Sequence, residues 1–164
     1  MIGKKMQEAM NNQINEELYS AYLYLSMAAW FEKNNLRGAA SWMRKQSGEE
    51  TGHAMKFFNH ILERGGEVEL LPIKGPKKEW TSILEVFEAS LEHERHVSAR
   101  INDLYSLALK ENDYASQVFL QWFVEEQVEE EASVDEVVQK LKLVSDSKQG
   151  IFMVDRELGM RGND

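Results

Sequence analysis

The chain has 164 residues, enough for one domain with a sizeable core, and its 43% hydrophobic and 29% charged residues are ordinary for a soluble globular protein. It contains no cysteine, which excludes disulfides, thiolate metal sites, iron–sulfur clusters and thiol catalysis. Its net charge of −9 argues against nucleic acid and membrane surfaces as partners, and no apolar run reaches the roughly 18 residues that a membrane span needs.

The first half of the chain predicts two long helices. From about residue 4 to 33 there is no helix breaker, and apolar residues recur at alternating steps of four and three. The turn signal Asn34-Asn35 leads directly into a second helix, from about 36 to 64, which Gly65-Gly66 ends. Because this connection is so short, the two helices are expected to be antiparallel neighbours.

A segment without helical period follows, from about residue 67 to 78, and it contains Pro72, Gly75 and Pro76. Helices of about 29 residues are about 43 Å long, so a segment of this length can cross a bundle from end to end, which a short turn cannot. Its apolar middle, Leu70-Leu71-Pro72-Ile73, predicts that it packs on another surface, such as a second subunit.

The second half predicts two more long helices and a short one. The third helix opens with the capping box Ser82–Glu85 and runs to about residue 111. Asn112-Asp113 separates it from a fourth helix, from about 114 to 143. Ser145-Asp146 is the expected cap of a short last helix.

The predicted fold is therefore all-α, with a single domain over residues 1–164. It consists of a four-helix bundle over about residues 4–143, with a long crossover between helices 2 and 3, and a short C-terminal fifth helix over about 146–158. The tail from Met160 to Asp164 is expected to be mobile.

Each long helix carries polar residues on its otherwise apolar seam, near its midpoint. These residues are Glu17, Glu50, His53, Glu94, Gln127 and Glu130. Midpoints of helices of equal length meet at one level of a bundle, whichever way the helices run. The six polar side chains are therefore predicted to converge in the core.

The coincidence on all four helices favours a metal site. A single buried glutamate is more simply a registry device or a surface residue, and one E-x-x-H motif arises by chance in glutamate-rich helices. Four carboxylates at one level would repel each other, however, and two divalent cations would cancel their four charges. Oxygen ligands with one imidazole and no sulfur suit iron or manganese, with zinc as a competitor.

With these motifs the chain resembles the non-haem bacterial and archaeal ferritins over nearly its whole length. The resemblance is carried by E-x-x-H at Glu50 and His53 and by Q-x-x-E at Gln127 and Glu130. Haem-carrying relatives have a second E-x-x-H on helix 4, and a methionine where this chain has Thr51. The resemblance therefore implies a ferritin-like di-iron bundle without haem.

The resemblance also implies a ligand set and a group of catalytic residues. One iron would bind Glu17, Glu50 and His53, and the second would bind Glu50, Glu94 and Glu130. Glu50 would bridge the two ions, with Gln127 close by. Tyr24, two turns from Glu17 on the same seam, would lie beside the site, and a plain core aromatic is its alternative reading.

Three further carboxylates match the family's third iron site, in which Glu130 is shared. They are Glu49, Glu126 and Glu129, each one position off the seam. Spacing alone favours a solvated acidic face for them, whereas the resemblance favours a third iron site.

The resemblance implies a cytoplasmic iron-storage protein with ferroxidase activity. Fe(II) would be oxidised by O2 at the di-iron site, and Fe(III) would be stored as a hydrated oxide inside a hollow homo-oligomeric shell of 24 subunits. Two other readings remain open at this point. One is a non-catalytic helical interaction protein whose midline carboxylates lie in a wet cavity, and the other is a small di-iron oxidase with a pocket for an organic substrate.

Overall fold

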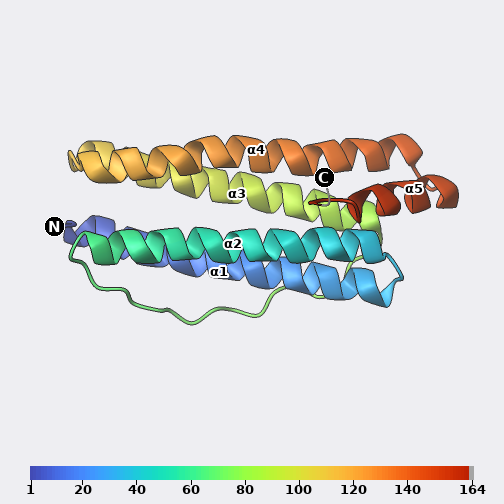
Figure 1. The fold of residues 1–164 in the computed structure, drawn as a ribbon, viewed down its shortest axis with the longest axis horizontal. Helices are drawn as coiled ribbons and strands as arrows, with labels where there is room; N and C mark the ends of the chain where they lie inside the picture. Colours follow the sequence, from blue (N-terminus) through green and yellow to red (C-terminus); the bar gives the residue numbers. More distant parts are fainter. Residues whose placement is uncertain (163–164) are drawn as a thin grey trace.

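The computed structural model describes residues 1–162, and these residues form a bundle of four long helices and one short helix (Figure 1). The helices are α1 (Lys4–Lys33), α2 (Arg37–Glu63), α3 (Ile83–Lys110), α4 (Tyr114–Val144) and α5 (Lys148–Leu158). α1 pairs with α2, α3 pairs with α4, and α1 packs on α3. The all-α prediction is confirmed. Within the described range, no helix is both long enough and apolar enough to cross a membrane.

The turns follow from residues that tolerate special backbone conformations or cap helices. Asn35 and Asn112 adopt positive φ values of 60° and 54°, which asparagine accepts more readily than most residues. The hydroxyl of Ser82 accepts a hydrogen bond from the Glu85 amide at 3.1 Å, as the capping box predicts. The predicted cap of the fifth helix is wrong by two residues, because Ser147 accepts the Gly150 amide at 3.1 Å and Ser145 ends α4 instead.

The crossover between α2 and α3 runs along the whole length of the bundle, beside α1 (Figure 1). Side chains of α1 hold its backbone. Asn11 bonds the Glu67 carbonyl (3.0 Å) and the Glu69 amide (2.9 Å). Asn15 donates to the Pro72 carbonyl at 3.0 Å. The long crossover is thus confirmed. Leu70 in its middle remains 67% exposed, and its packing on a second subunit stays a prediction.

The buried core divides into two apolar clusters. We call them the α5-end cluster, which includes Phe31, Phe87 and Leu141, and the N-terminal-end cluster, which includes Met10, Phe57 and Ile101. On α3, Leu91 belongs to the first cluster and Val97 to the second, and the buried residue midway between them is Glu94. A polar layer therefore separates two apolar ends.

α5 folds back onto the start of α2. A Cβ atom at Gly38 would lie 1.7 Å from the Asp155 carbonyl oxygen, so this contact requires glycine. The carboxylate of Asp155 accepts the Ala39 amide at 2.8 Å. In the tail, Arg161 is hydrogen-bonded to α2, and the mobility expected for residues 160–162 stays a prediction. Residues 163 and 164 lie outside the described range.

Candidate metal centre

The structure brings the six polar seam residues together in the middle layer of the bundle. Glu17 comes from α1, Glu50 and His53 from α2, Glu94 from α3, and Gln127 and Glu130 from α4. None of them is more than 5% exposed. This convergence follows from helix geometry, because each residue lies near the midpoint of a helix of similar length.

One group of possible metal ligands consists of Glu17, Glu50 and His53, each of which offers a ligand atom within 4.8 Å of the other two. Nδ1 of His53 lies 3.2 Å from Oε2 of Glu50 and 4.0 Å from Oε2 of Glu17. Oε1 of Glu17 accepts a hydrogen bond from Nε2 of Gln13 at 2.9 Å. Oε2 is buried and has no hydrogen-bond partner among residues 1–162, which fits an oxygen that binds a cation.

The second group consists of Glu50, Glu94 and Glu130, whose ligand atoms also lie within 4.8 Å of one another. Here the carboxylates are held by neutral donors. The Tyr24 hydroxyl donates to one oxygen of Glu94, and Nε2 of Gln127 donates to the other at 3.1 Å. Nε2 of Gln46 donates to Oε2 of Glu130 at 2.5 Å. Because Glu50 belongs to both groups, it lies where a carboxylate could bridge two ions.

A third group, at the edge of the layer, contains His53, Glu126 and Glu130. Nε2 of His53 lies 3.9 Å from Oε1 of the half-buried Glu126. Of the three residues predicted for a third iron site, only Glu126 joins such a group among the described residues. Glu49 and Glu129 are exposed, and Glu49 is hydrogen-bonded to Arg161 instead.

Burial raises the pKa values of the carboxylates in this layer. It raises the pKa of Glu17 well above its usual value, and the charge of Glu50 raises it further. Burial, followed by the charges of Glu94 and Glu130, raises the pKa of Glu50 in the same direction. Burial also raises the pKa of Glu94 to about 6 and that of Glu130 to about 7. A cation bound among these carboxylates would lower their pKa values again, since it favours the ionised form.

Tyr24 is more than a packing residue in this arrangement. It is fully buried, and burial together with the charge of Glu94 raises the pKa of its phenol well above 10, so the hydroxyl stays protonated and donates to Glu94. The ring of His93 packs edge-on against it, with centroids 5.9 Å apart. Burial lowers the pKa of His93 to about 4, which keeps that imidazole neutral.

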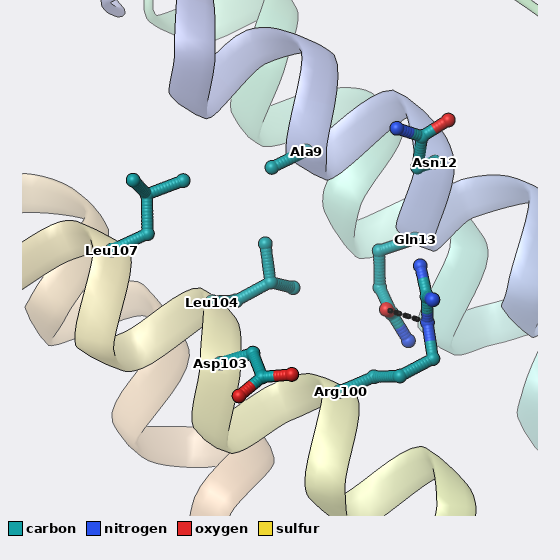
Figure 2. Close-up of a pocket in the computed structure, with 7 residues that line it drawn as sticks. All are labelled: Ala9, Asn12, Gln13, Arg100, Asp103, Leu104 and Leu107. Carbon is teal, nitrogen blue, oxygen red and sulfur yellow. Dashed lines mark hydrogen bonds between the residues drawn. The ribbon is translucent and has the colours of Figure 1, made fainter.

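Sequence reasoning did not single out Gln13 and Gln46, the two amides that hold ligand carboxylates. Both are fully buried. Gln46 stands on the apolar seam of α2, and a buried amide on a seam is the signal that could have found it. Gln13 lies at the wall of a pocket of about 210 Å³ between α1 and α3 (Figure 2).

One residue that lines this pocket, Gln13, is hydrogen-bonded to a residue of the metal centre. It is lined by Ala9, Asn12, Gln13, Arg100, Asp103, Leu104 and Leu107. Nε of Arg100 donates to Oε1 of Gln13 at 3.2 Å, and the amide of Gln13 donates in turn to Glu17. None of the six polar seam residues lines this pocket, and Gln13 is its link to the ligand Glu17.

The donor set fits hard or borderline divalent ions. It offers carboxylate oxygens and one imidazole and no sulfur, which favours iron or manganese over a structural zinc site. A family model for the ferritin-like domain matches residues 7–144, most of the chain. The chain belongs to the ferritin family.

Relatives of this ferritin-family chain match it over nearly their whole length. It is 47% identical over 161 residues to a bacterial non-heme ferritin of Bacteroides fragilis, covering 98% of this chain and 100% of the relative. It is 39% identical over 156 residues to a bacterial non-heme ferritin of Campylobacter jejuni, covering 95% and 93%. The structure of an open pore ferritin from the hyperthermophilic archaeon Archaeoglobus fulgidus superposes with a TM-score of 0.97 at 50% identity, covering 98% of both chains. The resemblance to bacterial and archaeal non-haem ferritins is confirmed.

Proposed function

We propose that this protein stores iron, and that it oxidises Fe(II) with O2 at the paired carboxylate site before storing Fe(III) as a hydrated oxide inside a hollow shell of its own copies. The observation that carries the proposal is the pair of buried ligand groups that share Glu50. Two ferrous ions side by side can each give one electron, so that O2 takes up two electrons and two protons from solvent to become hydrogen peroxide while both ions become Fe(III). Iron is a substrate here, since it passes through the site on its way to the store.

Each residue of the paired site has a proposed task. Glu17 and Nδ1 of His53 bind the first ferrous ion, Glu94 and Glu130 bind the second, and Glu50 bridges the two. Tyr24 and Gln127 fix the carboxylate of Glu94 from both of its oxygens. Such donors to ligand carboxylates keep the ligands in place before iron arrives, which lowers the cost of binding.

A third iron position is proposed at the exposed edge of the site, with Glu49, Glu126, Glu129 and the shared Glu130 as its ligands. The closeness of Glu126 to His53 and Glu130 supports it. The charge of Glu49 contributes to the raised pKa of Glu130, which supports a position of Glu49 facing the same carboxylate.

The paired site is tested by mixing the metal-free protein with Fe(II) in air and following ferric absorbance. We expect the double variant Glu50→Ala, His53→Ala to oxidise iron on the order of 100-fold more slowly than the parent, because loss of a ligand exceeds the 10- to 100-fold cost of losing a residue that only supports one. The matched control is Glu92→Ala, His96→Ala on the exposed face of α3, which we expect to behave as the parent. Equal rates in the first variant and the parent would overturn the site.

A homo-oligomeric shell, of 24 subunits, is the second part of the proposal. Several large apolar side chains are exposed on the single chain, including Leu25, Val118 and Phe152, which supports their burial between copies. Size-exclusion chromatography or mass photometry of the purified protein measures the particle directly. A small oligomer would contradict storage in a shell and favour a helical interaction protein.

A further inference from the structure

The tail beyond α5 carries a positive charge to the exposed edge of the metal centre. After the close contact of Gly159 with Gly38, the chain turns back along α2 and places Arg161 beside Glu49. Nη2 of Arg161 donates to Oε2 of Glu49 at 2.9 Å, and the side chain of Arg161 is 25% exposed. The guanidinium of Arg161 is thus hydrogen-bonded to a carboxylate that is proposed to bind iron.

Several contacts hold this guanidinium in one place. Nη1 of Arg161 donates to Oε1 of Gln46 at 3.0 Å and to the carbonyl oxygen of Trp42 at 3.2 Å. Its Cζ atom lies 4.4 Å from the centroid of the Trp42 ring, a cation–π distance. A guanidinium with four such partners is more ordered than an ordinary surface arginine, whose ion pairs contribute little.

The same guanidinium is one side chain away from the paired site. Gln46, which accepts from Arg161, donates through Nε2 to Glu130 at 2.5 Å and to Glu50 at 3.3 Å. Arg161 is therefore in contact with Glu49 directly and with two ligands of the pair through one buried amide. No other cationic side chain is hydrogen-bonded to Glu49 or Gln46 among residues 1–162.

We propose that Arg161 competes with ferrous iron for Glu49 and so weakens the third iron position. The paired position is unchanged, because Gln46 holds Glu130 and Glu50 through Nε2, whereas Arg161 contacts Oε1. The inference rests on the proposed third position. A guanidinium and a divalent cation repel each other and cannot both use Oε2 of Glu49, so an ion that binds there displaces the tail. Because Arg161 competes to re-form its hydrogen bond with Glu49, the third ion is held only weakly and leaves this position readily for the store.

The competition is measured by titrating the assembled, metal-free protein with Zn(II), and with Fe(II) under argon, in an isothermal calorimeter. The variants are Arg161→Ala, Arg161→Lys, Glu49→Gln and the double variant Arg161→Ala, Glu49→Gln. We expect Arg161→Ala to tighten the weakest ion about fivefold, the upper range for a partly exposed ion pair, and to leave the two tight ions as in the parent. Arg161→Lys keeps the positive charge but loses the planar guanidinium and its stacking on Trp42. Its affinity for the weakest ion should therefore lie between those of the parent and of Arg161→Ala.

Two controls separate competition from a merely structural role of the tail. Lys140→Ala removes the ion pair of α4 with Glu157 of α5, which loosens α5 without touching Glu49, and it should leave all affinities as in the parent. In the Glu49→Gln background, Arg161→Ala should have no further effect, because the carboxylate for which the two cations compete is gone.

Three results would overturn the inference. They are an unchanged weak affinity in Arg161→Ala, an effect of Arg161→Ala that persists with Glu49→Gln, and loss of the two tight ions in Arg161→Ala. Failure of the proposed function looks different, because it would show as tight binding of two ions that survives Glu50→Ala, His53→Ala. Thermal unfolding midpoints of all variants show that each one is folded.

Discussion

The α5-end cluster and the polar layer beside it are built on the same four helices, and they differ in what they do for the fold. In the cluster, Phe31 and Phe87 stack with ring centroids 5.6 Å apart, and both are fully buried. Such packing stabilises the bundle under any solution condition that keeps it folded. In the polar layer, burial raises the pKa of Glu17 and Glu50, so these side chains oppose folding as they ionise.

The difference teaches where stability and function reside in this bundle. The apolar ends make the helices long and rigid enough to bring four midpoints to one level. The polar layer lowers the stability of the metal-free protein. Bound cations restore that stability, since a ligand that binds only the folded state stabilises the fold. Changes at the ends should therefore lower stability and leave metal binding intact, whereas changes in the middle should weaken metal binding and, where they remove a buried carboxylate, stabilise the metal-free protein.

The largest effect is expected at an apolar end. Phe31→Ala removes a fully buried ring and should lower the free energy of unfolding by about 3–5 kcal/mol, because it leaves a cavity. Calorimetric unfolding of the metal-free protein measures the change as a lower midpoint. Titration with Zn(II) should still show two tight ions per subunit, and their loss would break the proposed separation of the two regions.

Glu130→Gln is expected to change the free energy of unfolding in the opposite direction, that is, to stabilise the metal-free protein. The pKa of Glu130 is about 7 in the folded protein against an ordinary value of 4.5, so the folded state binds the extra proton. Stability is therefore lost as pH rises from about 4.5 through 7, at about 1.4 kcal/mol per pKa unit. At pH 8 the metal-free amide variant should be more stable than the parent by up to about 3 kcal/mol, and at pH 5 the difference should shrink to less than about 1 kcal/mol.

The stabilisation that metal gives to Glu130→Gln can also be compared with the stabilisation that it gives to the parent. Unfolding midpoints are measured at pH 5 and 8 with a chelator and again with Zn(II). The amide should gain less from the metal than the parent does, because it has lost a charged ligand. A metal-free amide variant that unfolds below the parent at pH 8 would show that the ionised Glu130 stabilises the fold, contrary to this account.

Proton release gives a smaller effect that reports the layer directly. The pKa of Glu94 is about 6 and that of Glu130 about 7, so both are partly protonated at pH 6 and largely ionised at pH 8. Metal binding should release more protons at pH 6 than at pH 8, and iron oxidation should slow as pH falls below about 6. A pH indicator in weakly buffered solution measures the release on addition of Zn(II). Equal release at the two pH values would contradict the raised pKa values.

The smallest effect is expected from Tyr24→Phe. The variant loses the hydroxyl that donates to Glu94 and keeps the ring, so we expect the second ion to bind about fivefold more weakly, as for one hydrogen bond of about 1 kcal/mol. Tyr22→Phe, on an exposed position of α1, is the matched control. If Tyr24 is only a core aromatic, both variants will bind metal as the parent does.

The helices and the polar layer could be predicted because their signals are local and chemically conspicuous. The turn signals at residues 34–35 and 112–113 lie next to the observed helix ends, and a carboxylate such as Glu94 stands out on an apolar seam. The positions of Glu49 and Glu129 were harder, because one step along a helix turns a side chain by about 100° away from the seam.

Contacts between distant parts of the chain were beyond sequence reasoning. Arg161 lies 112 positions from Glu49 in sequence, and its contact depends on the path of a tail that no periodicity describes. The amide of Gln46 looks like any polar residue until the carboxylate of Glu130 is placed 2.5 Å from it. Ser145 and Ser147 are both residues that commonly cap a helix, so the sequence of that turn does not show that Ser147 is the one that accepts the Gly150 amide.

The central claim is that buried carboxylates in the middle of this bundle are matched by a pair of metal ions, and X-ray diffraction at the iron absorption edge tests it most directly. Crystals of the metal-free protein would be soaked in Fe(II) without oxygen. Apart from any weaker peak at the third position, the account predicts a pair of anomalous peaks in each subunit about 3.5–4 Å apart. Glu50 should lie between them, with one peak beside Glu17 and His53 and the other beside Glu94 and Glu130. Carboxylates that point away from one another, with no iron between them, would contradict it.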